Sequence, residues 1–242
     1  MKSPLSHSEQ APMHPALLLQ RRSLAACIIL APLSISLYLV SWEGNQRAPL
    51  TPLITSAMAG PTGNTLHFIG AIAASFFLPL GYLGMSLLGM RRAPWLATIS
   101  AALSLVGWIP WAALMGLDSL AYDIDQRGLT PQLAALWTNF NGDAVMTTYL
   151  LIYVIGHLLS AVLIGLMLGR LRLIPAWAAW AFALTSPLTI PIILVHNLLF
   201  QDILKYLVCA LWIIGAIPAA LAMLTNRDLT PAPPSPAQSI QE

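Results

Sequence analysis

Two residues inside one apolar stretch could do chemistry, His157 and Tyr153. His157 lies halfway along the apolar run 145–169, and an ionisable group buried in a membrane is by default a functional candidate because its burial is costly. Tyr153 precedes it by one helical turn on the same helix face and is its expected partner. The pair predicts either a proton relay or ligand contact, or a neutral histidine that packs and hydrogen-bonds to a neighbouring helix.

Two further histidines are expected at similar depth, near the outer surface of the membrane. His67 opens the run 66–89 and His196 closes the run 174–195. Axial haem ligation needs two histidines that face each other at one level, and the same pair with an outer carboxylate would suit a divalent metal. The sequence has no tight His pair of the kind that a metal-binding helix carries. We therefore predict no cofactor and keep haem or a divalent metal as the alternative.

Acidic residues gather on the side of the membrane where His67 and His196 are expected. Their bias suggests a polar cluster that binds or moves a small uncharged or cationic ligand. Together with the pair at the middle of the membrane, the predicted ligand-binding residues are His67, Asp118, Asp143, Tyr153, His157, His196, Asn197 and Asp202.

Motifs for catalysis and for nucleic-acid binding are missing from the sequence. There is no nucleotide-binding loop, no Ser-His-Asp order and no carboxylate-rich motif for phosphorylated lipids. The basic residues do not cluster with aromatics as a nucleic-acid surface requires. An enzyme is therefore not favoured, and catalytic residues are not assigned. A membrane enzyme or a haem or metal redox subunit using His67 and His196, and an accessory subunit of a membrane complex, remain as alternatives.

Composition fixes the class of protein that must position these residues. Of 242 residues, 57% are apolar and 8% are charged, against about 25% charged in soluble domains. A membrane-spanning helix needs about 20 apolar residues. We expect an all-α bundle of six transmembrane helices between a tail at 1–20 and a Pro-rich tail at 226–242. The domain is 21–225, and the spans are 24–42, 66–89, 94–116, 145–169, 174–195 and 203–224.

The positions of Lys and Arg predict the orientation of these spans. With the N-terminus inside, eight basic residues flank the cytoplasmic ends and only Arg47, Arg127 and Lys205 face outward. Both termini are therefore predicted to be cytoplasmic, in a multi-pass protein of the bacterial inner membrane. Its expected partners are the lipid bilayer and a small-molecule ligand, with a second copy or a partner subunit as a further option.

Proline is the other recurrent feature of the spans. Five of them contain an internal proline, and the segment 185–191 has two prolines among Thr and Ser residues whose hydroxyls can bond freed carbonyls. Such a locally unwound helix lines the site of many transporters, although proline is common in membrane helices generally. Outside the spans, Thr130 and Pro131 are a helix-start signal, and Leu133, Leu136 and Trp137 would form one face of a short surface helix.

The turn after the fourth predicted span has the pattern Arg-x-Arg-x-Ile-Pro-x-Trp, from Arg170 to Trp177. It resembles a turn found in several uncharacterised six-helix bacterial membrane-protein families of unknown function. The resemblance covers the fourth and fifth spans. It implies the six-helix architecture and no activity.

Overall fold

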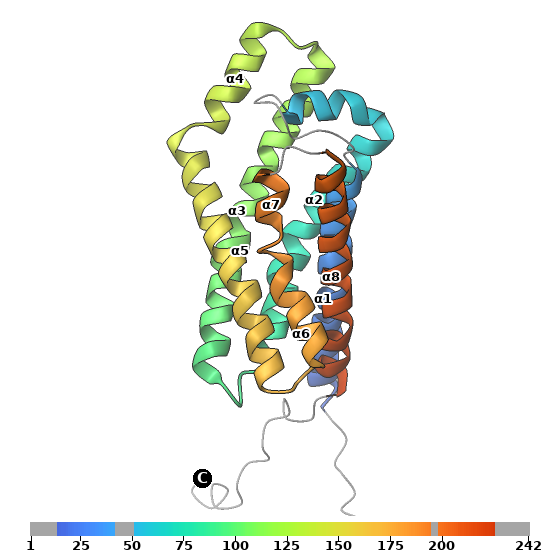
Figure 1. Cartoon of the computed structure of the whole chain (residues 1–242), viewed down its shortest axis with the longest axis vertical. Coiled ribbons are helices and arrows are strands. Elements are labelled where there is room, and N and C mark those ends of the chain that lie inside the picture. The colour runs from blue at the N-terminus through green and yellow to red at the C-terminus, as the bar shows by residue number, and fades with distance from the viewer. Residues whose placement is uncertain (1–13, 42–50, 195–197, 226–242) are drawn as a thin grey trace, which may run out of the picture.

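The structure is a computed structural model that describes residues 14–41, 51–194 and 198–225. Within these ranges the chain forms helices and no strand. The helices run largely side by side along the long axis in Figure 1. They are α1 (Pro15–Ser41), α2 (Thr51–Leu88), α3 (Pro94–Arg127), α4 (Pro131–Asn141), α5 (Ala144–Arg170), α6 (Ala176–Thr185), α7 (Thr189–Leu194) and α8 (Leu198–Thr225).

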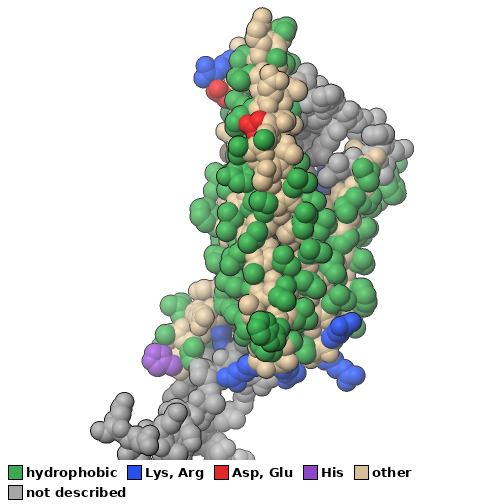
Figure 2. Space-filling view, turned by 90° about the vertical axis from the view of Figure 1, so that its left-hand side faces the viewer, with side chains coloured by type: hydrophobic (Ala, Val, Ile, Leu, Met, Phe, Trp, Pro, Cys, Tyr) green, Lys and Arg blue, Asp and Glu red, His purple; other side chains and the backbone are tan. Residues whose placement is uncertain are grey.

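Five segments are long and apolar enough to cross a membrane. They are Pro15–Ser41, Gly60–Leu88, Pro94–Arg127, Ala144–Arg170 and Leu199–Thr225. Their outward faces are also apolar, and Figure 2 shows hydrophobic side chains along the flank with Lys and Arg gathered at the lower end. Apolar residues on the outside as well as in the core are expected of helices that lie in lipid. The chain thus has the character of a helical membrane protein.

The fifth predicted span is a broken helix. Its apolar stretch, Ala176–Ile192, is shorter than the other five and is divided between α6 and α7. At the break, the Thr185 hydroxyl donates to Phe182 O at 2.7 Å and the Thr189 hydroxyl donates to Ser186 O at 2.6 Å. The break itself is as expected, but the hydroxyls bond to Phe182 O and Ser186 O rather than to the carbonyls that Pro187 and Pro191 free, which belong to Ala183 and Pro187. The internal prolines of the other predicted spans do not break the helix where they lie: Pro32, Pro79, Pro110 and Pro218.

Four helices extend beyond the predicted boundaries. α1 and α8 start at Pro15 and Leu198 rather than at 24 and 203, so the last residues of the predicted tail 1–20 are helical. In α2 the backbone turns at Gly60, whose φ of 65° and ψ of −179° interrupt the helix, so the apolar segment starts there rather than at 66. Helix α3 continues past the predicted end at 116 to Arg127, and its last turns meet α4 at the end of the bundle (Figure 1).

The short predicted helix is present as α4. The Thr130 side chain accepts a hydrogen bond from Leu133 N at 3.3 Å, with Pro131 in the first turn, so the start signal is confirmed. Trp137 is buried and donates from Nε1 to Leu117 O at 3.0 Å. The predicted common face is only partly correct, because Leu136 is 53% exposed. The hydrogen bond and the packing of Trp137 fix α4 to α3, so α4 is not a separate surface helix.

The bundle is a closed ring of helices around one core. Each helix contacts its neighbours in the order α1, α2, α3, α5, α6, α8 and back to α1. Aromatic residues from different helices meet at the centre, where Tyr82 of α2 contacts Trp108 of α3 and Phe182 of α6 at ring distances of 5.5 and 5.2 Å. This ring order brings α1, α2 and α3 together at the end opposite the arginines.

Candidate functional site

His67 of α2 and Asp118 of α3 meet inside the bundle. Nε2 of His67 lies 3.2 Å from Oδ2 of Asp118, and the two residues are 2% and 8% exposed. Tyr38 of α1 completes the group, because its hydroxyl donates to the same Asp118 oxygen at 3.0 Å. The Tyr38 ring also lies over the imidazole, with ring centres 4.2 Å apart. Three helices thus each supply one member of a buried polar triad.

The hydrogen bonds of the triad fix where its protons lie. Nδ1 of His67 lies 3.0 Å from the backbone oxygen of Tyr38, which only accepts hydrogen bonds, so Nδ1 carries a hydrogen. Nε2 and Asp118 then share one further proton, either as imidazolium and carboxylate or as neutral imidazole and carboxylic acid. Both forms have no net charge. Without that proton a lone pair would face a buried carboxylate, so the arrangement favours retention of one exchangeable proton.

A glycine lets Tyr38 approach His67. Gly70 lies one helical turn beyond His67 on α2, and a Cβ atom built there would lie 2.5 Å from the backbone nitrogen of Tyr38. Because any larger residue would separate α1 from α2, the contact between the Tyr38 carbonyl and His67 depends on this position. Neither Tyr38 nor Gly70 was among the predicted site residues. The available signal was the end position of Tyr38 in the first span, at the depth expected for His67.

The other predicted outer residues have different surroundings. Asp143 caps α5, where its Oδ1 accepts a hydrogen bond from Met146 N at 2.7 Å. Asp202 is exposed and pairs with Lys205 at 3.1 Å on the same helix. Within the described part of the chain, neither carboxylate bonds to the triad. His196 and Asn197 lie outside the described residues.

His157 occupies the middle of the core with Tyr153 beside it. The two rings are stacked with centres 4.3 Å apart, and Nδ1 of His157 lies 2.7 Å from the backbone oxygen of Tyr153. The predicted partnership is therefore present, although it uses the ring and the carbonyl rather than the phenol hydroxyl. Because a carbonyl only accepts, Nδ1 donates, and the neutral ring leaves an accepting lone pair on Nε2.

Several buried polar atoms around His157 make no hydrogen bond of good geometry among the residues that the structure describes. His157 Nε2 is one acceptor, and Trp108, whose ring centre lies 5.5 Å from the imidazole, presents an unpaired donor. Unsatisfied buried groups are rare in proteins, and they mark places where water or a ligand is held. The atoms of this interior polar cluster are Tyr82 Oη, Trp108 Nε1, Trp111 Nε1, His157 Nε2, Ser186 Oγ and Trp212 Nε1. Tyr82 does interact electrostatically with the side chains of Ser186, Trp212 and Thr185.

Aromatic contacts join the triad to the interior polar cluster. Tyr38 meets Trp111 edge to face at 4.9 Å, and Trp111 lies 5.4 Å from Tyr153, which stacks on His157. The broken helix contributes as well, because Ser186 at the break is fully buried and belongs to the cluster. One continuous line of polar-edged side chains therefore leads from the triad to the centre of the bundle.

The haem or metal alternative needs an available ring nitrogen on His67 and a second ligand, His196, which lies outside the described residues. Both ring nitrogens of His67 are engaged, Nδ1 with a carbonyl and Nε2 with a carboxylate, so a ligand nitrogen would have to be released first. Among the described residues no group of three or more His, Cys, Asp or Glu side chains is placed to hold a metal ion.

Comparisons with protein families, with curated proteins and with solved structures each find no match for this chain. Function therefore has to be argued from the triad and the interior polar cluster themselves.

Proposed function

We propose that the protein is a six-span inner-membrane protein, with both termini in the cytoplasm, that binds and moves a small cationic or uncharged ligand. The ligand enters from the extracytoplasmic side at the triad of Tyr38, His67 and Asp118. The observation that carries the proposal is the buried contact of 3.2 Å between Nε2 of His67 and Oδ2 of Asp118, from which we infer a shared proton.

The distribution of charge supports the orientation. The turn after α2 holds Arg91 and Arg92, and α5 ends at Arg170 with Arg172 in the turn that follows. Arg92 Nη1 donates to Leu171 O at 3.4 Å, so both turns lie at one end of the bundle, and the positive-inside rule assigns that end to the cytoplasm. The triad lies toward the opposite end of the bundle. His67 is separated from the end of α2 at Leu88 by a helical rise of about 30 Å, which is about the thickness of the hydrocarbon core.

The chemistry of the triad supports a cationic ligand. A cation that reaches Asp118 can replace the shared proton and leave the site without net charge, so the apolar surroundings do not have to accept an unpaired carboxylate. An uncharged ligand with a donor or acceptor group could instead bond to Tyr38 and His67 while the proton stays. In both cases Asp118 is the residue on which binding depends.

The interior polar cluster supports movement through the bundle rather than binding alone. Its unpaired donors and its one imidazole acceptor give a polar ligand, or the water that accompanies it, a place to bond halfway across the bundle. The break between α6 and α7 adds the irregular backbone that lines transport sites in other membrane proteins. A redox subunit and an accessory subunit remain alternatives, and no observation on the described residues favours either.

Proton release on cation binding tests the proposal. The purified full chain in weakly buffered detergent solution is mixed with tetramethylammonium, guanidinium or sodium chloride, and the pH change and the melting temperature are recorded. We expect one proton released per bound cation and, by mass action, binding about tenfold tighter for each pH unit within the range where the empty site is protonated, with no further change above that range.

Asp118→Asn removes the exchangeable proton of the carboxylate and should abolish both signals. Asp123→Asn on the same helix is the matched control, because Asp123 is exposed and pairs only with Arg127 among the described residues. Proton release and stabilisation that persist in Asp118→Asn, or that disappear equally in both variants, would rule out the triad as the binding site.

A further inference from the structure

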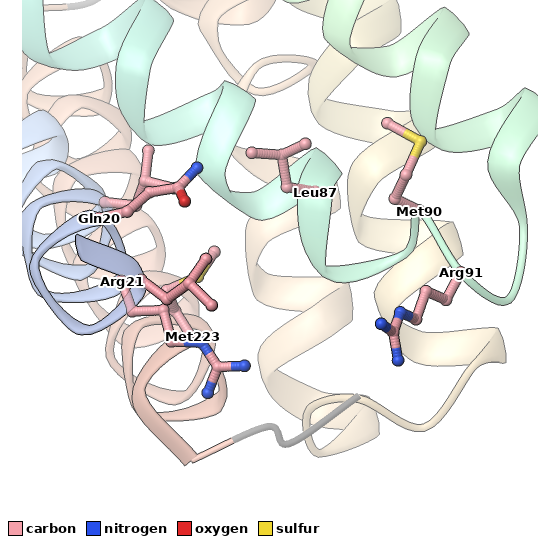
Figure 3. Close-up of a pocket in the computed structure, with 8 residues that line it drawn as sticks. Gln20, Arg21, Leu87, Met90, Arg91 and Met223 are labelled. Atoms are coloured by element: carbon pink, nitrogen blue, oxygen red, sulfur yellow. The ribbon is translucent and has the colours of Figure 1, made fainter. Parts of the chain in front are cut away.

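A cavity of about 220 Å³ opens at the arginine end of the bundle, far from the triad. Three elements surround it: the first turns of α1, the end of α2 with the turn that follows, and the last turns of α8 (Figure 3). Its walls are Leu17, Gln20, Arg21, Leu24, Leu87, Met90, Arg91 and Met223.

Two arginines from different helices contribute to this cavity. Arg21 of α1 is only 5% exposed, although its neighbour Arg22 is exposed. Arg91 lies in the turn after α2, and in Figure 3 the two guanidinium groups point toward the space between them. Two guanidinium groups that converge from separate helices attract a group with two negative oxygens, and a phosphate is the best match because each guanidinium can bond to it in a bidentate way.

The rest of the wall is apolar. Leu17, Leu24, Leu87, Met90 and Met223 provide most of its surface and leave Gln20 as the one uncharged polar side chain. The volume is below the roughly 300 Å³ at which pockets for whole drug-sized molecules begin, so the cavity holds part of a molecule. An occupant with a charged end and an apolar continuation fits both properties.

We propose that this cavity is a binding site for the phosphate of an anionic phospholipid. The phosphate lies between Arg21 and Arg91, and the first carbons of the glycerol and acyl chains lie against the Leu and Met side chains. Basic pockets between helices at the membrane surface are the expected receptors for anionic headgroups. The arginines lie at an end of an apolar bundle, which is the depth at which lipid phosphates are found. The proposal is independent of the ligand proposed for the triad and of which face of the membrane the arginines occupy.

Lipid binding to the purified full chain is the test, measured by native mass spectrometry and by the shift in melting temperature. The probes are phosphatidylglycerol, phosphatidylcholine and inorganic phosphate, each added to delipidated protein in the same detergent. We expect phosphatidylglycerol to bind and to raise the melting temperature, with phosphatidylcholine and phosphate at equal concentration giving a much smaller effect.

Three substitutions separate the cavity from general surface charge. Arg21→Gln and Arg91→Gln should each weaken phosphatidylglycerol binding about tenfold or more, because each removes a charge-assisted contact to the phosphate. Arg22→Gln removes the same charge from the next position of α1 and should leave binding almost unchanged. Since Arg91 is exposed, Arg91→Gln should fold normally even if Arg21→Gln does not.

The outcomes are distinct. Equal weakening by Arg22→Gln and Arg91→Gln would show diffuse charge attraction and overturn the proposal. Binding of inorganic phosphate that matches that of phosphatidylglycerol would assign the cavity to free phosphate rather than to lipid. Phosphatidylcholine, which carries the same phosphate beside a choline cation, would overturn the assignment to an anionic lipid if it bound with the same strength. The proposal stands only if phosphatidylglycerol is preferred and Arg91→Gln removes that preference.

Discussion

Gly107 of α3 and Gly156 of α5 touch backbone to backbone at the centre of the bundle. A Cβ atom at Gly107 would lie 2.6 Å from the carbonyl carbon of Gly156 and from the nitrogen of His157. The next residue on each helix, Trp108 and His157, belongs to the interior polar cluster. The glycine contact therefore sets the distance at which α3 and α5 present these two side chains.

Enlarging either glycine should separate the two helices. We expect Gly107→Ala and Gly156→Ala each to lower the free energy of unfolding by about 1–3 kcal/mol, because the new methyl group meets backbone that has no rotamer to change. Thermal unfolding in detergent measures the effect. Gly116→Ala on α3 is the control, since nothing lies within 4 Å of a Cβ atom there. Equal behaviour of Gly116→Ala and Gly107→Ala would contradict the close approach.

The triad should be energetically coupled. Removing one partner leaves the other buried and unpaired, so His67→Ala and Asp118→Ala should each cost about 3 kcal/mol, and the double variant should cost less than their sum. A double-mutant cycle on unfolding in detergent should give a coupling energy of about 1–3 kcal/mol. The exposed pair Asp123 and Arg127 serves as a reference cycle and should give less than about 1 kcal/mol. Additive effects at His67 and Asp118 would argue against a shared proton.

The two buried histidines should respond differently to an apolar substitution. His67→Leu deprives Asp118 and the Tyr38 carbonyl of a partner, whereas His157→Leu removes one hydrogen bond to the Tyr153 carbonyl and an acceptor atom that has no partner among the described residues. We expect His157→Leu to change the free energy of unfolding by no more than about 1 kcal/mol and His67→Leu to cost clearly more. If His157→Leu costs as much as His67→Leu, Nε2 of His157 bonds to water or a ligand in the folded protein.

Cysteine accessibility checks the proposed orientation. In a chain that carries Cys27→Ser and Cys209→Ser, a membrane-impermeant maleimide should label Gln132→Cys on α4 in intact spheroplasts. Arg91→Cys should be labelled only after the membrane is opened. Both positions are exposed, so access to the reagent depends on the membrane alone. The reverse labelling pattern would place the triad on the cytoplasmic side and remove the basis for ligand entry from outside.

Helix positions followed from the sequence because length and hydropathy determine them in lipid. Two local features were also predictable: the start of α4 at Thr130 and Pro131, and the break near Pro187. Both depend on local hydrogen bonding that can be inferred from the residue types. The ends of α2 and α3 did not. Gly60 interrupts a helix through its backbone conformation, and α3 continues past 116 because α4 packs on it. Neither cause is visible in a local hydropathy pattern.

The triad was predictable only in part. Depth along the spans placed His67 and Asp118 at one end of the bundle, and the structure joins them. The depth of a residue does not tell which side of its helix faces the core. Asp143 and Asp202 were therefore predicted as site residues on the same grounds as Asp118. The ring order of the helices decides which carboxylate faces inward. Tyr38 was missed for the same reason, because its role depends on the close packing of α1 against Gly70.

The turn between α6 and α7 limits the mechanical coupling between these two helices. A continuous helix behaves as one rod, and tilting its outer end moves its inner end. Here Leu188 N still bonds to Leu184 O, but Thr189 N bonds to Ser186 O and Ile190 N bonds to Pro187 O, so the i→i−4 ladder of α6 ends at Leu188. The Thr189 hydroxyl reaches back only to Ser186, the residue that follows α6. α7 is therefore joined to α6 through a turn and packs on α8, so the two short helices are separate segments of the ring rather than one rod.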